Sequence, residues 1–311
     1  MKTVYLDNNC YERLLKNNKA YELLFSLSQN DKGLLSFESS WYTCAGLALG
    51  REASGDGDAY IAMLKAVYEL IRKDRFFRDF PELVAEEVDA AMGRRKSPHL
   101  FYDGEEGECQ RRLSQWLMVR DKGLPLYMLL EVKKERAAWV SKMEILRGKQ
   151  VRESREQGCR PAEQVSPPQA VPYACRSPQA REWMVETLAR RFPVLANAWA
   201  AVPDMIANHL HAFRTFYRAF AAFHLTRLAA DASHIRPHRS LRGQGRHKPD
   251  DPSDMRHAAY GRYCDYFVTE DNTLRDVVSM IEETDANGNV FKAWSLAEFL
   301  QEAERTATAV E

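Results

Sequence analysis

Residues 254–274 read DMRHAAYGRYCDYFVTEDNTL, and this stretch decides the fold that the sequence predicts. Residues 254–264 are typical of a helix that opens at Asp254, and residues 266–269 form a short apolar run typical of a strand. Asp271 lies just past the carboxyl end of that strand, and residues 274–282 have the pattern of a second helix. A helix, a strand and a helix in succession favour an α/β fold.

The two ends of the chain repeat this alternation. Residues 2–6 predict a buried strand that stops at Asp7, residues 11–27 a helix, and residues 34–37 a second strand that ends at Glu38. Near the other end, residues 290–294 predict a last strand, and Ser295 with Glu298 forms a capping box that opens a final helix. A strand, a helix and a strand in order favour a parallel central sheet built from both chain ends.

The middle of the chain has a different pattern. Apolar residues recur at helical spacing through residues 58–150, including 79–92 and 113–146, and five prolines interrupt residues 151–180. A helix resumes near residue 179, and it is followed by an aromatic stripe that predicts core packing: Phe213, Phe216, Tyr217, Phe220 and Phe223. We therefore predict one domain from residues 1–54 and 250–311, a large all-helical insertion or cap at 55–233, and a basic loop at 234–249.

Composition narrows the class of protein. The 311 residues carry a formal net charge of zero, 45% hydrophobic residues and 28% charged residues, the balance of a soluble globular protein. Nucleic-acid binding would have to come from local patches, because the whole chain creates no basic field. The six cysteines form no CxxC pair, which argues against a zinc ribbon and favours reduced thiols in the cytoplasm. We expect no signal peptide and no membrane partner.

Four carboxylates fall at the edges of the predicted strands and helices, and they are the candidate catalytic residues: Asp7, Glu38, Asp254 and Asp271. Ligands bind beyond the carboxyl ends of parallel strands, so acids far apart in sequence can converge there. Such a cluster suits Mg²⁺ or Mn²⁺, which would activate water for attack on a phosphate. Taken one at a time, the three aspartates could equally be helix caps, and Glu38 an ordinary loop acid.

These residues resemble the PIN-domain family of nucleases. Residues 4–15, VYLDNNCYERLL, are similar to the strand, aspartate and helix that open PIN domains; residues 254–274 resemble their second signature, with its Thr-x-Asp segment; and residues 290–300, VFKAWSLAEFL, look like the closing strand and helix. The resemblance implies an α/β/α sandwich with a parallel central sheet and metal-dependent cleavage of RNA. It makes Asp7, Asp254 and Asp271 the metal ligands, with support from Thr269 and Asn8.

The chain departs from the family in two places. Glu38 is the best candidate for the middle acid, although the family places it later, on a helix; Glu38 and Asp254 are also much farther apart here. Two other functions therefore stay open: a PIN-like RNA- or protein-binding module without catalysis, and a haloacid-dehalogenase-type phosphatase. The second is weakened because Asn9 stands where that class needs an aspartate.

A basic segment directly precedes the Asp254 helix. Residues 234–248, HIRPHRSLRGQGRHK, contain no acid, and we predict that its cations contact RNA phosphates: Arg236, Arg239, Arg242, Arg246 and Lys248. A solvated connector is the equal alternative. The leading hypothesis is an RNA endonuclease, such as the toxin of a toxin–antitoxin or defence system. Its expected partners are RNA and an antitoxin or other protein, with a homo-oligomer left open.

Overall fold

A computed structural model gives the structure of most of the chain. It describes residues 1–29, 34–40, 43, 47, 57–102, 126–156, 178–231, 248, 251–281 and 290–308. These residues divide into two compact units, each described by itself. The first unit comprises Met1–Val132, Tyr260–Asp271 and Thr284–Glu311, and the second comprises Lys133–Ala259 and Asn272–Glu283.

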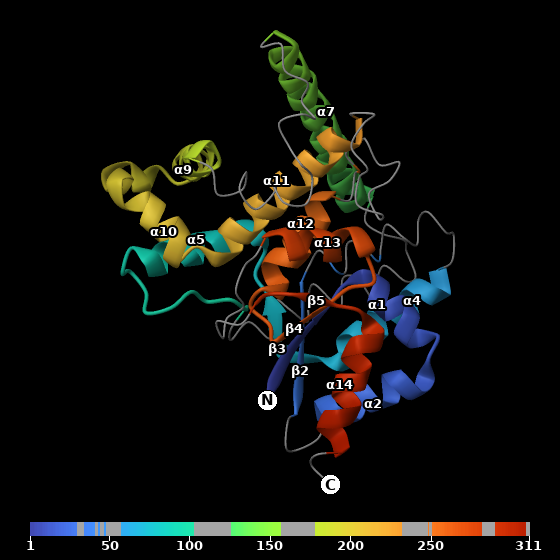
Figure 1. Ribbon diagram of the computed structural model, residues 1–311. Coiled ribbons are helices and arrows are strands. Elements are labelled where there is room, and N and C mark those ends of the chain that lie inside the picture. Colours follow the sequence, from blue (N-terminus) through green and yellow to red (C-terminus); the bar gives the residue numbers. More distant parts are fainter. Residues whose placement is uncertain are drawn as a thin grey trace. The chain divides into compact units, whose positions relative to one another are not determined.

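The first unit contains a five-stranded sheet in which every pair of neighbours is parallel (Figure 1). Its order is β3-β2-β1-β4-β5, with β1 in the centre. The strands are β1 (Lys2–Leu6), β2 (Leu35–Ser40), β3 (Ile71–Phe77), β4 (Tyr266–Val268) and β5 (Ala293–Trp294). The α/β class and the parallel sheet are therefore confirmed, and the predicted strands at both chain ends belong to it.

The predicted helix over residues 11–27 is in fact two helices. Helix α1 (Asn8–Leu15) ends at Lys16, and α2 (Asn18–Gln29) begins after Asn17. The Asn17 side chain accepts the backbone N–H of Ala20 at 3.2 Å. A side-chain oxygen in that position caps a new helix, so it starts α2 instead of letting α1 continue.

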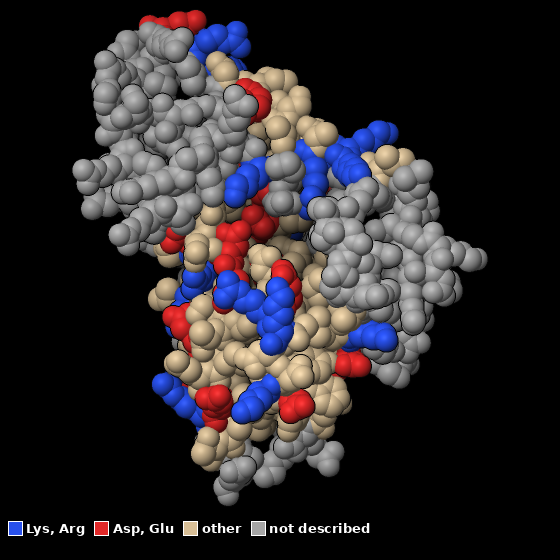
Figure 2. Space-filling view, turned by 90° about the vertical axis from the view of Figure 1, so that its right-hand side faces the viewer, with Lys and Arg blue, Asp and Glu red and all other residues tan. Residues whose placement is uncertain are grey.

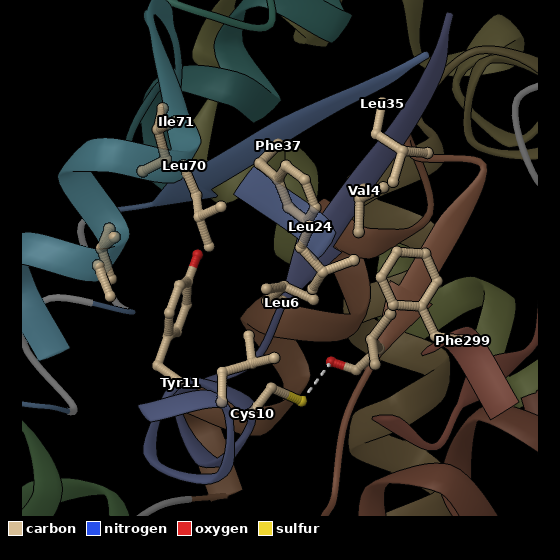
Figure 3. Close-up of a cluster of buried hydrophobic side chains, with 14 of the residues drawn as sticks. Val4, Leu6, Cys10, Tyr11, Leu24, Leu35, Phe37, Leu70, Ile71 and Phe299 are labelled. Carbon is tan, nitrogen blue, oxygen red and sulfur yellow. Dashed lines mark hydrogen bonds between the residues drawn. The ribbon is translucent and has the colours of Figure 1, made fainter. Parts of the chain in front are cut away.

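One face of the sheet packs against helices and forms an apolar core. Val4, Leu6 and Phe37 point from β1 and β2 into a cluster that also contains Leu24 of α2 and Phe299 of α14 (Figure 3). Helix α14 (Leu296–Thr308) lies beside α2, and α4 (Gly57–Leu70) contacts both α1 and α2 (Figure 1). Helix α14, near the C-terminal end, and strand β1, near the N-terminal end, therefore contribute side chains to the same core.

The opposite face of the sheet carries an aromatic cluster. The ring of Tyr5 lies 5.9 Å from that of Phe77 and 6.0 Å from that of Tyr260. A Cβ atom on Gly261 would lie 2.8 Å from the Cβ atom of Phe267, closer than real contacts allow. Only a glycine at position 261 lets the backbone approach the Phe267 side chain so closely.

The prediction that the middle of the chain is all helical is wrong at β3. Its apolar residues Ile71, Phe76 and Phe77 are buried against the sheet, and the strand pairs with β2 with a register shift. Pairing with a neighbouring strand overrides a local helical pattern because it satisfies the backbone and buries the aromatic rings. Helix α5 (Phe80–Ala91) then follows much as predicted, and it also belongs to the first unit, beyond the boundary expected at residue 54.

The second unit is helical in its described residues. Its elements are α7 (Leu126–Glu156), which begins in the first unit, α9 (Pro178–Arg191), the 3₁₀ helix η1 (Pro193–Ala201), α10 (Val202–Asn208), α11 (His211–Asp231), α12 (Asp251–Gly261), which ends in the first unit, and α13 (Asn272–Ile281). Phe213, Phe220 and Phe223 of α11 are buried, as the aromatic stripe predicted. Helix α7 runs into the expected proline-rich loop, whose residues 157–177 lie outside the described part of the chain.

The predicted capping box at the last helix is confirmed. Glu298 accepts the backbone N–H of Ser295 at 2.7 Å, and Ser295 Oγ accepts the backbone N–H of Glu298 at 3.2 Å. The two residues therefore satisfy each other's backbone donors at the start of α14. None of the described helices combines the length and the hydropathy that a bilayer-spanning segment needs.

Asp265 joins the start of β4 to β1, and this contact predicts a pH-dependent stability. Burial alone would raise its pKa, but hydrogen bonds from Thr3 and Lys2 and the Lys2 charge outweigh it, so the pKa of Asp265 lies below its ordinary value. A carboxyl whose pKa is lowered by folding stabilises the fold above its unfolded pKa, about 3.9, and this stabilisation is lost as the pH falls through the folded value.

We expect Asp265→Asn to be less stable than the wild type at neutral pH, with the difference shrinking below about pH 4. Urea unfolding at several pH values measures the free energy of unfolding of both proteins. A difference that stays constant down to the acid range would contradict the assignment.

Candidate functional site

The carboxyl ends of β1 and β4 lie side by side. Leu6 pairs with Val268 in the parallel register, so Asp7 and Thr269 occupy the next positions on adjoining strands. The backbone N–H of Asp7 still donates to the Val268 carbonyl at 2.9 Å. Open parallel sheets bind ligands beyond the carboxyl ends of their strands, as here at β1 and β4.

The Asp7 carboxylate is buried and held at both oxygens. Oδ1 accepts the backbone N–H of Asn8 at 2.6 Å, and Oδ2 accepts the Thr269 hydroxyl at 2.7 Å; the residue is 3% exposed. Asp7 is also the N-cap of α1, so the alternative prediction, that Asp7 caps a helix, is confirmed. Hydrogen bonds to an ionised carboxylate are strong, and these two hold it in one orientation.

Thr269 links Asp7 to Asp271. Its oxygen accepts the backbone N–H of Asp271 at 3.1 Å while its hydroxyl donates to Asp7. Thr269 is fully buried, whereas Asp271 is half-buried. The Thr269 hydroxyl therefore holds the Asp7 carboxylate and, at the same time, the backbone of Asp271.

Asn8 donates its backbone N–H to Asp7, and its side chain has a buried oxygen atom. Its N–H donates to Asp7, but its side-chain oxygen Oδ1 is buried without a hydrogen-bond partner among the described residues. A buried oxygen of this kind costs free energy unless a donor, a water or an ion meets it. Beside a held carboxylate, it is a further hard oxygen that a cation could use.

Glu270, which the sequence did not single out, fastens the site to two helices. Its Oε1 accepts the backbone N–H of Leu296 in α14 at 2.7 Å, and its Oε2 pairs with Arg13 in α1 at 2.5 Å. The charge of Glu270 also acts on the Cys10 thiol: burial is the main cause that raises the pKa of this thiol well above its ordinary value, and the charges of Asp7 and Glu270 raise it further. The only sequence signal for Glu270 is its place between Thr269 and Asp271.

Glu38 does not end its strand, which corrects the prediction. It lies inside β2, opposite Tyr5, and the strand continues to Ser40. Its carboxylate is buried and accepts the Cys264 thiol at 3.2 Å. Glu38 therefore lies two residues behind the level of Asp7, or about 7 Å along the strand direction.

Three buried hydroxyl groups cluster near the carboxyl end of β2. The Tyr5 phenol lies 2.7 Å from Ser40 Oγ and 3.2 Å from Thr43 Oγ1, and all three residues are buried. Burial raises the pKa of Tyr5 well above its ordinary value, so its phenol stays protonated. The sequence offered no signal for this cluster beyond a run of serines.

Asp254 does not open its helix, contrary to the prediction. Helix α12 begins at Asp251, whose carboxylate accepts the backbone N–H of Lys248 at 3.0 Å, and Asp254 lies half-buried in the first turn. Asp254 belongs to the second unit, whereas Asp7, Glu38 and Asp271 belong to the first.

The predicted RNA contacts are mostly beyond the described residues. Lys248 is described and exposed, but four arginines lie outside the described part: Arg236, Arg239, Arg242 and Arg246. Over the face drawn in Figure 2, cations and carboxylates are intermingled, in keeping with the zero net charge.

The fit of the site to a divalent ion is partial. Within the described ranges, no group of three or more His, Cys, Asp or Glu side chains is placed to hold a metal. Mg²⁺, however, commonly binds through one or two carboxylates and keeps several waters. Asp7, Asp271 and the Asn8 amide oxygen are compatible with that mode of binding, and their donor chemistry suits a hard cation.

Comparison of the chain with protein-family models, with curated proteins and with solved structures finds no match.

Proposed function

We propose that the chain is a PIN-like, metal-dependent ribonuclease whose centre lies at the carboxyl ends of β1 and β4. The observation that carries the proposal is the link from Asp7 through the buried Thr269 hydroxyl to Asp271. This arrangement holds the Asp7 carboxylate in one orientation and ties the backbone of a second acidic residue to it, at the carboxyl ends of the strands, where α/β sheets bind ligands.

In this proposal Asp7 and Asp271 hold Mg²⁺ or Mn²⁺, and the Asn8 side-chain oxygen contributes as a neutral ligand. The family resemblance implies a further acidic ligand at Asp254, but the proposed centre is built from residues of the first unit. The chemistry that such an ion supplies is activation of water and stabilisation of charge on the scissile phosphate. Thr269 is a positioning residue, because its hydroxyl fixes the orientation of Asp7.

The remaining charged groups have supporting roles. Glu38 is the proposed assisting residue, inside β2 and two residues behind the level of Asp7. The basic segment, including Arg236, Arg239, Arg242, Arg246 and Lys248, contacts the RNA backbone. Action as a cytoplasmic toxin with an antitoxin partner remains part of the same proposal.

The proposal is tested with the full-length chain and a fluorescent single-stranded RNA. We expect cleavage with Mg²⁺ or Mn²⁺, none with excess EDTA, and recovery when the ion is restored. Isothermal titration of Mn²⁺ into the protein gives a second readout that does not depend on the choice of RNA.

The second candidate is a PIN-like binding module without catalysis. The specific observation in its favour is that the described residues hold no group of three or more possible metal-ligating side chains. RNA binding without Mn²⁺ uptake and without cleavage would select this candidate and reject the ribonuclease.

A further inference from the structure

A cation, Arg78, lies at the same end of the sheet as the proposed centre. Arg78 directly follows β3, just as Asp7 follows β1 and Thr269 follows β4, and all three residues belong to the first unit. Ligands of an open parallel sheet bind beyond these carboxyl ends. A substrate that reaches Asp7 therefore passes over the region in which Arg78 lies.

The strand register gives the separation between Arg78 and Asp7. The parallel register of β1 and β2, continued by two residues, brings Asp7 level with Ser40. Ser40 in turn lies opposite Phe77, the last residue of β3. Neighbouring strands are about 4.8 Å apart, so the Cα atom of Arg78, two strands away and one residue further on, lies about 10 Å from that of Asp7. Because stacked nucleotides rise about 3.4 Å each, a few nucleotides span this distance.

The Arg78 guanidinium is held by an aromatic ring. Its Cζ atom lies 5.2 Å from the centre of the Tyr102 ring, within the range of a cation–π contact. The backbone of both residues is also fixed, since the N–H of Arg78 donates to the Leu100 carbonyl at 3.0 Å and the N–H of Tyr102 donates to the Phe76 carbonyl at 3.1 Å. The cation therefore has a defined place before any ligand binds.

No carboxylate of the described residues forms an ion pair with Arg78. Glu82 is joined to its aromatic partner instead, because the Glu82 carboxylate accepts the Tyr102 hydroxyl at 2.9 Å. Arg78 is half-buried, and its Nε atom is buried with no hydrogen-bond partner among the described residues. An arginine that stacks on a ring without a paired carboxylate is suited to phosphate, whose oxygens match its planar fork of donors.

We propose that Arg78 is a substrate-binding residue that holds a backbone phosphate of RNA a few nucleotides from the bond cleaved at Asp7. The identity of the ligand rests on the proposed ribonuclease function, whereas the place of the contact rests on the end of β3 and on Tyr102. Ser40 and Thr43, the described residues at the end of the intervening strand β2, are neutral. They add no charge that would repel the RNA backbone between the two residues.

The test measures fluorescence polarisation of a labelled single-stranded RNA with the full-length chain, in EDTA so that no cleavage occurs. We expect Arg78→Gln to weaken binding by about tenfold. It should also reduce the slope of log affinity against log salt by about 0.7, the share of one phosphate contact on a single strand. Arg78→Lys keeps the charge but loses the planar fork, so it should keep the salt slope and weaken binding by only about two- to threefold.

Arg94→Gln is the matched control. Arg94 lies beyond the other end of α5, a helix about 18 Å long that begins two residues after Arg78, and it pairs with Asp89. The control removes the same charge and should leave the affinity and the salt slope unchanged, and circular dichroism should give the same helix content for all variants. Unchanged affinity in Arg78→Gln, an equal loss in Arg94→Gln, or no RNA binding by the wild type would each overturn the proposal.

Titration of Mn²⁺ separates this inference from the proposed catalytic centre. Arg78→Gln should bind Mn²⁺ as the wild type does, and its single-turnover cleavage should fall at low protein concentration but recover at saturating protein. A wild type that takes up no Mn²⁺ and cleaves no RNA would reject the ribonuclease, while a loss of RNA affinity in Arg78→Gln would still support the contact with RNA. Loss of Mn²⁺ binding in Arg78→Gln, or slow cleavage that saturating protein does not restore, would overturn its assignment as a substrate-binding residue.

Discussion

Asp7→Asn is expected to reduce metal-dependent RNA cleavage by at least about a hundredfold, more than the loss of an outer-shell partner usually costs. Asparagine is nearly the same size, but it removes the negative charge and one oxygen from the group that the Asn8 N–H and the Thr269 hydroxyl hold. Single-turnover cleavage of labelled RNA at saturating protein is the measurement.

The fold should survive this substitution. Asparagine caps helices about as well as aspartate, so α1 keeps its start, and the lost charge-assisted bond to Thr269 costs about 1–2 kcal/mol of unfolding free energy. Glu12→Gln is the control, since Glu12 is an exposed acid of α1 that pairs only with Lys16 among the described residues. Wild-type cleavage by Asp7→Asn would remove Asp7 from the catalytic centre.

Phe299→Ala should lower the free energy of unfolding by about 3–5 kcal/mol. Phe299 is fully buried in the cluster of Figure 3, and its ring centre lies 5.3 Å from that of Tyr266 on β4. Alanine would leave a cavity between α14 and the sheet that the surrounding side chains fill only in part. Urea unfolding followed by circular dichroism measures the change.

Phe25→Ala is the matched control, because it removes the same ring from a site on α2 that is 38% exposed. We expect it to cost about 1–2 kcal/mol, clearly less than Phe299→Ala, since more than a third of the Phe25 surface is already in water and no closed cavity forms. Similar losses for the two variants would mean that α14 is not part of the sheet's core.

The sequence predicted most of the sheet because its signals are local. Apolar runs bounded by polar residues mark β1, β2 and β4, and the pair Ser295 and Glu298 marks the start of α14 through bonds only three residues long. Such patterns can be read without knowledge of the partner strand. Asp7 and Thr269 were identified for the same reason, since each directly follows a run of this kind.

Pairing between distant segments decided the rest. The charged sequence of β3 is typical of a helix, and only its place beside β2 makes it a strand. Glu38 was predicted at a strand end because the length of β2 depends on its neighbours, and that length places Glu38 inside the sheet opposite Tyr5.

The sequence by itself therefore determined the α/β class, the parallel sheet, and the positions of Asp7 and Asp271 after the carboxyl ends of β1 and β4. Tertiary structure alone determined that Thr269 joins the Asp7 carboxylate to the Asp271 backbone, and that the hydroxyls of Tyr5, Ser40 and Thr43 cluster near the end of β2. The physical reason is range: turns, caps and apolar periodicity act within a few residues, whereas hydrogen bonds and charges between elements act through space and leave no periodic signal in the chain.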